Sequence, residues 1–135
     1  MGIALSTRVA TRFEEAVART REALLEHGFG VLTEINVAAA LKARLGVDME
    51  DYLILGGCNP ELAHRAISVD REIGLLLPCN VVVRADPDDP GTVIVEAMDP
   101  GILVEVTGEP ALIAIADEGT EKLGAAIASL ATMCD

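Results

Sequence analysis

The segment that most constrains the fold is the apolar run Tyr52-Leu53-Ile54-Leu55-Gly56-Gly57-Cys58, with the Asn59-Pro60 pair directly after it. A short aliphatic run bounded by glycines is typical of a β-strand that is buried on both faces. Asn is a favoured N-cap, and Pro is favoured at the first helical position. The segment therefore predicts a buried strand that leads directly into a helix, with two glycines and a cysteine at the junction.

The rest of the chain alternates between strand and helix patterns in the same way. The polar turn Asp86–Gly91 separates two β-branched runs, which predicts a β-hairpin over residues 79–98. The order of patterns predicts a single two-layer α+β domain over residues 1–135, with a mixed sheet of about five strands and about four helices. The expected strands are 2–9, 29–35, 52–58, 79–84 and 92–98; the expected helices start near residues 11, 36, 59 and 110, and the last one ends near residue 133.

Composition excludes several classes of partner. The formal net charge of −12 opposes binding to a phosphate backbone, and three aromatic residues in 135 cannot build the usual platforms for stacking bases. No apolar run approaches the roughly 20 residues of a membrane span. The first residues lack the basic segment and apolar stretch of a secretory signal. We therefore expect a cytoplasmic protein that binds neither nucleic acid nor membranes.

The negative charge is concentrated in the second half of the chain. Residues 1–67 hold seven basic and nine acidic residues, a net of 7 − 9 = −2, whereas residues 68–135 hold three and thirteen, a net of 3 − 13 = −10. An excess of this kind mainly affects solubility and association.

The candidate site lies at two Cys-Asn pairs, within the segments Gly56–Pro60 and Leu77–Asn80. Paired glycines let a backbone approach a ligand closely, and a helix N-terminus favours a thiolate or a bound anion. If the two strands are neighbours, the two thiols lie close together. We expect ligand-binding residues at Gly56, Gly57, Cys58, Asn59, Cys79 and Asn80.

Three classes of function stay open at this point. The first is a dimer that binds a small molecule or an anion at these segments. The second is a thiol-dependent enzyme or redox carrier that uses Cys58 or Cys79, and the third is a structural or regulatory partner module. Cys58, Cys79 and Cys134 match no zinc or redox spacing, even with His64, so we expect no metal site. No residue pattern specifies a cofactor.

Unpaired edge strands favour a homodimer, because an exposed sheet edge must be covered or paired. The N-terminal strand 2–9 and the hairpin 79–98 are the candidates for such an edge.

Four motifs in order resemble the prokaryotic family known as domain of unknown function 302. They are the glycine-bounded strand Gly28–Ile35, the helix end Leu41–Val47, the junction Tyr52–Pro60 and the segment Ile73–Val81. Gly57 departs from the family pattern, where another small residue such as Ala is expected. The resemblance spans nearly the whole chain. It implies a compact α+β domain, usually a homodimer, in bacteria or archaea, and it implies no activity.

Overall fold

The structure is a computed structural model that describes residues 4–131. Its centre is a five-stranded sheet in the order β1-β5-β4-β3-β2, and every neighbouring pair is antiparallel. The strands are β1 (Ala4–Ala10), β2 (Gly30–Asn36), β3 (Tyr52–Cys58), β4 (Cys79–Ala85) and β5 (Thr92–Met98).

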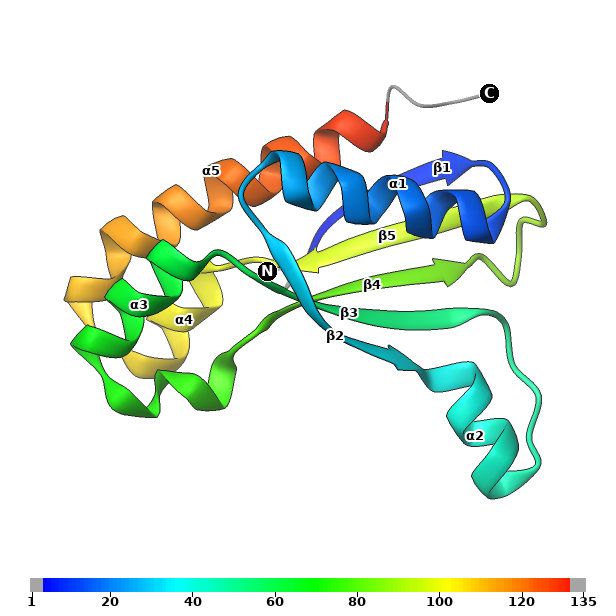
Figure 1. The fold of residues 1–135 in the computed structure, drawn as a ribbon, viewed down its shortest axis with the longest axis horizontal. Helices are drawn as coiled ribbons and strands as arrows, with labels where there is room; N and C mark the ends of the chain where they lie inside the picture. The colour runs from blue at the N-terminus through cyan, green and yellow to red at the C-terminus, as the bar shows by residue number, and fades with distance from the viewer. Residues whose placement is uncertain (1–3, 132–135) are drawn as a thin grey trace.

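Two helices cover one face of this sheet. They are α1 (Phe13–Glu26) and α5 (Ile113–Leu130), which lie side by side above the strands (Figure 1). Strand residues that alternate along the sheet point toward them, including Leu55, Val83 and Val95, and each of these is fully buried. The main core is therefore aliphatic, as the scarcity of aromatic residues requires.

The remaining helices extend the sheet at its two ends. At one end lies a helical group with a smaller core of its own, which includes Leu62, Ile73 and Leu112. At the other end α2 (Val37–Leu45) stands away from the body and has no buried residue (Figure 1). The helical group consists of α3 (Pro60–Val69), the 3-10 helix η1 (Arg71–Leu76), α4 (Gly101–Thr107) and the short 3-10 turn η2 (Pro110–Leu112) that precedes α5.

Local signals in the sequence account for several of these boundaries. The side chain of Asn36 accepts a hydrogen bond from Ala39 N at 2.9 Å, and that of Asn59 accepts one from Leu62 N at 3.1 Å, so both residues cap helices as expected. Gly28 follows α1 with a φ of +89°, a left-handed conformation that glycine adopts without strain.

The fold confirms a single-sheet α+β architecture of five strands, and it corrects four details. The sheet is antiparallel rather than mixed, because β2, β3, β4 and β5 each lie beside the strand that follows or precedes them in the chain. Helix α1 carries the chain from β1 at one edge to β2 at the other. The 79–98 hairpin lies inside the sheet, so the described edges are β1 and β2. The helices cover the apolar run of β3 on one face only, and Ile54 on the other face is partly exposed. The long helix expected from residue 110 begins as a 3-10 turn and becomes α-helical at Ile113.

Candidate functional site

The two Cys-Asn segments meet at the junction of the sheet with the helical group. In the β3–β4 pair, Gly57 lies opposite Cys79 and Gly56 lies opposite Asn80. Cys58 is the last residue of β3, and Asn59 caps the helix that follows. The register makes the two strands neighbours, which is the condition under which the sequence places the two thiols close together.

A cavity of about 40 Å³ lies at this junction. Four of the six expected site residues line it: Gly57, Cys58, Asn59 and Cys79. The other walls come from Phe29, from the helical group and the residue after η1 through Leu62, Ala66, Leu77 and Leu103, and from α5 through Ile115 and Gly119. Because the walls are almost wholly aliphatic carbon with two thiols, the cavity suits an apolar group rather than a charged one.

Gly56 and Asn80 do not line the cavity. Successive residues of a strand point to opposite faces, so these two residues face away from α1 and α5. A Cβ on Gly56 would lie 2.1 Å from Thr33 Oγ1 and 2.8 Å from Pro78 Cγ. Glycine is needed at residue 56 for close packing between neighbouring chain segments, which is a structural role. Asn80 is exposed on the same face.

Cys79 differs from an activated nucleophile, whose thiol has a lowered pKa. Burial, and to a smaller extent the neighbouring Cys58, raises the pKa of Cys79 from 9.0 to about 11. Cys79 is therefore a neutral thiol at physiological pH. Both cysteines are free and partly buried. Cys134 lies outside the described residues.

The start of α3 is already occupied by its own cap. Asn59 is buried, and a Cβ on Gly28 would lie 3.0 Å from its Nδ2, so the loop after α1 closes over the cap. Its Oδ1 takes the Leu62 N–H that an anion would otherwise use. This helix start is therefore built for packing, and it offers an anion fewer free donors than a bare N-terminus.

Within residues 4–131, no group of three or more His, Cys, Asp or Glu side chains is placed to hold a metal ion. His64 is exposed on α3 and is not among the residues that line the cavity. No helix of the described chain is long and apolar enough to cross a membrane.

Sequence reasoning missed the half of the cavity that comes from α4 and α5. Pro100, Leu103, Ile115 and Gly119 are distant in sequence from the Cys-Asn segments, and no motif marks them. One signal was present: a glycine inside a long helix often has a packing reason. Gly119 has such a reason, because a Cβ there would meet Pro100 at 3.4 Å and Leu62 at 3.7 Å.

Comparison with known protein families shows which family the chain belongs to. The family described as "Domain of unknown function DUF302" matches residues 5–130. The chain belongs to the DUF302 family. A crystal structure of an uncharacterised conserved DUF302 protein from Bacillus stearothermophilus is similar to it, with 31% sequence identity and a TM-score of 0.85. The match covers 95% of this chain and 98% of that one, so the two share their fold over nearly their whole length. A search of the curated proteins found no match.

Proposed function

We propose that this DUF302 protein is a homodimer that binds a small apolar molecule, or the apolar end of a larger one, in the cavity beside Cys58 and Cys79. The observation that supports binding is an aliphatic cavity at the meeting point of sheet and helices. A space of about 40 Å³ exceeds the roughly 10–15 Å³ that one water needs. Its lining is almost wholly apolar, with Asn59 and the two thiols as the polar side chains, and such a lining favours apolar occupants over water.

The cavity favours the small-molecule alternative over the anion alternative. Among residues 4–131, no charged side chain lines it, and the helix N-terminus beside it is capped by Asn59. The cavity also argues against Cys79 as the nucleophile of a thiol enzyme, since burial keeps that thiol protonated.

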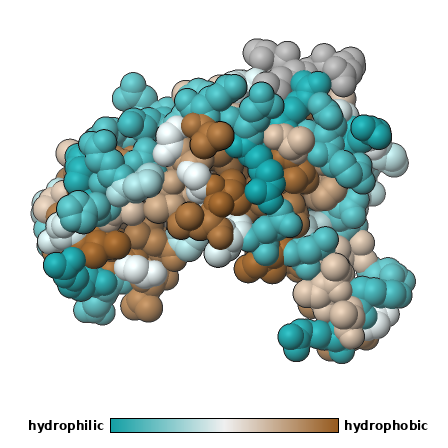
Figure 2. Space-filling model, viewed as in Figure 1, coloured by the Kyte–Doolittle hydropathy of each residue, from teal (hydrophilic) through white to brown (hydrophobic). Residues whose placement is uncertain are grey.

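The homodimer is supported by the edges and the uncovered face of the sheet. Strands β1 and β2 each have a free edge within the described chain, and Leu32 and Ile35 on β2 are 69% and 52% exposed. Apolar side chains gather over β2 in the middle of the face shown in Figure 2. Sedimentation at micromolar concentration is expected to give twice the 14.1 kDa mass of one chain, and a mass of one chain contradicts the dimer.

Xenon is the probe for the cavity, because small apolar cavities bind it and it forms no hydrogen bonds. Amide resonances of residues 57–59, 62–66 and 115–119 are expected to shift in two-dimensional NMR spectra under xenon pressure. Short-chain alcohols of increasing length then report how far the cavity extends. Shifts spread evenly over the surface would contradict the proposed site.

Two glycines of α5 provide a matched pair of variants for this test. In Gly119→Ala the new methyl group enters the cavity wall beside Pro100 and Leu62. In Gly124→Ala it meets nothing within 4 Å. Both variants gain about 1 kcal/mol of helix propensity, so both are expected to fold, and only Gly119→Ala is expected to weaken xenon binding. If the two variants bind xenon equally well, the cavity is not the binding site.

A further inference from the structure

An apolar groove with acidic walls lies at the end of the molecule opposite α2. It has a volume of about 270 Å³ and runs between η1 and α4. Its lining includes the apolar side chains of Leu75 and Val106, which are 83% and 64% exposed, and the acidic residues Asp70 and Glu72. Glu105 is exposed beside it on α4. Large exposed apolar side chains grouped in a groove mark an interaction surface.

Helix α2 has the complementary properties. Val37, Leu41 and Leu45 follow one another at four-residue spacing, which places them along one stripe of the helix. Leu45 is 68% exposed. The only charged residues of α2 are basic, Lys42 and Arg44, in a chain whose net charge is −12. Lys42 forms a salt bridge with Asp48, in which Nζ lies 2.8 Å from Oδ1. Arg44 forms no salt bridge with any residue of the described chain.

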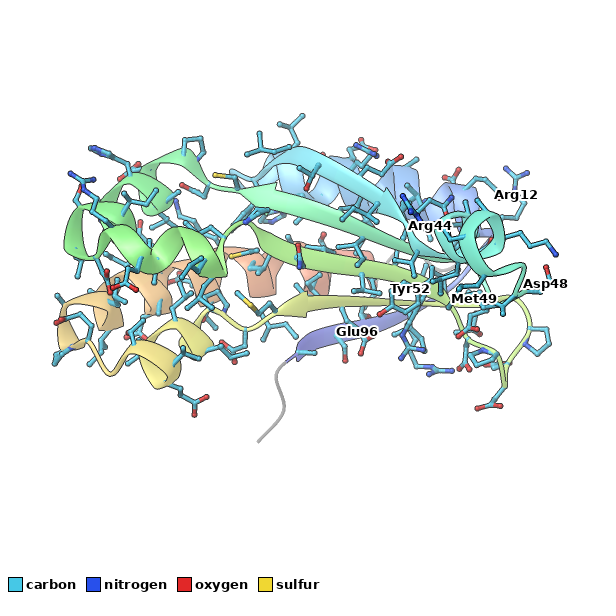
Figure 3. The ribbon with its side chains drawn as sticks, turned by 90° about the horizontal axis from the view of Figure 1, so that it is seen from below. Arg12, Arg44, Asp48, Met49, Tyr52 and Glu96 are labelled. Carbon is cyan, nitrogen blue, oxygen red and sulfur yellow. The ribbon has the colours of Figure 1, made fainter. Side chains whose placement is uncertain are left out.

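The two features cannot meet within one chain, because they lie at opposite ends of the long axis (Figure 1). Between them lies the uncovered face of the sheet, onto which Figure 3 looks, with Tyr52 and Glu96 on it and Arg44 at the α2 end. The register places Ile35, Ile54 and Val82 in one row across this face. A two-fold axis that runs parallel to this face and perpendicular to the long axis turns the uncovered faces of two copies toward each other and exchanges their ends. The α2 helix of one copy then comes to lie at η1 and α4 of the other.

We infer that α2 docks into the η1–α4 groove of a second copy, and that the second copy's α2 docks in return. This inference rests on the homodimer proposed above and specifies its interface. The apolar stripe of α2 then covers Leu75 and Val106, and Arg44 faces Glu72 and Glu105. An amphipathic helix in an apolar groove is a common mode of recognition, and opposite charges at the rim fix the partner and its orientation. The paired uncovered faces bury the Ile35–Ile54–Val82 row at the centre.

Charge reversal tests this interface, because the altered residues are exposed and folding is preserved. Arg44→Glu reverses a charge on α2, and the double variant Glu72→Arg/Glu105→Arg reverses two charges at the groove. Each variant alone is expected to raise the dimer dissociation constant about tenfold or more, which corresponds to about 1.4 kcal/mol. Glu22→Arg on the outer surface of α1 is the control and is expected to leave dissociation unchanged. Leu45→Ser is expected to weaken the dimer without any change of charge.

Mixing the two charge variants gives the decisive result. In the mixed dimer, the α2 helix with Arg44→Glu meets the groove that now carries two arginines. At the other contact, an unaltered α2 meets an unaltered groove. Sedimentation of the mixture is therefore expected to show a dissociation constant close to that of the natural dimer, which each variant alone exceeds. A local loss of α2 structure in Arg44→Glu would not be repaired by the groove variant.

If the natural chain is a dimer that all these variants leave intact, the interface is elsewhere and this inference is overturned while the homodimer stands. A monomeric natural chain overturns both.

Discussion

At the scale of single residues, Cys79 has the clearest electrostatic signature of the site. Its pKa is raised from 9.0 to about 11, first by burial and then by Cys58. Reaction with an alkylating reagent requires the thiolate, which is scarce at pH 8 when the pKa is 11. A thiolate of higher pKa is intrinsically more nucleophilic, which offsets part of this effect. We expect Cys79 to react about tenfold or more slowly at pH 8 than a free cysteine, as measured by iodoacetamide labelling and peptide mass spectrometry. A rate equal to that of free cysteine contradicts this environment.

The same shift in pKa makes stability depend on pH. The unfolded chain releases the Cys79 proton near pH 9, and the folded chain holds it until about pH 11. The stability contributed by the neutral thiol is therefore full below pH 9 and is lost as the pH rises through 11. We expect the free energy of urea unfolding to fall between pH 8.5 and 11 more steeply in the natural chain than in Cys79→Ala. The difference is on the order of 2 kcal/mol, since each pKa unit is worth about 1.4 kcal/mol. Parallel pH profiles would show that the thiol does not carry this dependence.

Gly56 tests close packing on the uncovered face of β3. A methyl group there would overlap Thr33 Oγ1 and the ring of Pro78, at 2.1 and 2.8 Å. Thr33 can rotate away, but the proline ring cannot. We expect Gly56→Ala to lower the free energy of unfolding by about 1–3 kcal/mol, the usual cost of overpacking. Gly30→Ala on β2, where nothing lies within 4 Å of the new atom, is the matched control. Thr33→Ala is expected to restore only part of the loss.

At the scale of elements, the caps of α2 and α3 show how burial changes the contribution of a capping hydrogen bond to the free energy of unfolding. Asn59 is buried at the junction, whereas Asn36 is exposed. Asn59→Ala leaves the Leu62 N–H without its partner inside the protein, and we expect it to cost about 1–2 kcal/mol in urea unfolding. Asn36→Ala is expected to cost less, because water replaces the lost acceptor. Asn59→Asp preserves the acceptor and is the control; if it destabilises as much as Asn59→Ala, capping is not the role of this residue.

The elements that were predictable from sequence are those with strong local chemistry. The glycine-bounded run 52–58, the Asn-Pro start of α3 and the turn at Asp86–Gly91 each specify their structure through neighbouring residues. Sheet order depends instead on which strands meet across long stretches of chain. The antiparallel pairing of β1 with β5, and the place of β4 beside β3, therefore had no local signal.

The residues around the candidate site also fall into two groups, those with a local signal in the sequence and those without one. Gly57, Cys58, Asn59 and Cys79 line the cavity, and the sequence marks them because they lie at or next to strand ends in two similar segments. Gly56 and Asn80 belong to those segments too, but strand alternation directs them to the other face. The walls from α4 and α5 exist only through tertiary packing, so no spacing in the sequence points to them.

At the scale of the whole molecule, the charge distribution has a consequence for stability. Residues 85–121 contain no basic residue, and they include the exposed carboxylates Glu105, Asp117 and Glu121. The ion pairs of the described chain, such as that between Arg65 and Glu118 at 2.6 Å, are at the surface and contribute little each. Repulsion among the excess negative charges is therefore the larger electrostatic effect on folding.

Salt should stabilise this protein, because it screens that repulsion more than it weakens the few surface pairs. We expect the thermal midpoint to rise by about 3–5 °C between 10 and 200 mM sodium chloride at fixed protein concentration, which corresponds to about 1 kcal/mol. The double variant Asp117→Asn/Glu121→Gln removes two of the unpaired charges and leaves the η1–α4 groove unchanged. It is expected to melt higher than the natural chain at low salt and to respond less to added salt. A midpoint that falls with salt in the natural chain would mean that the surface pairs outweigh the repulsion, contrary to the charge count.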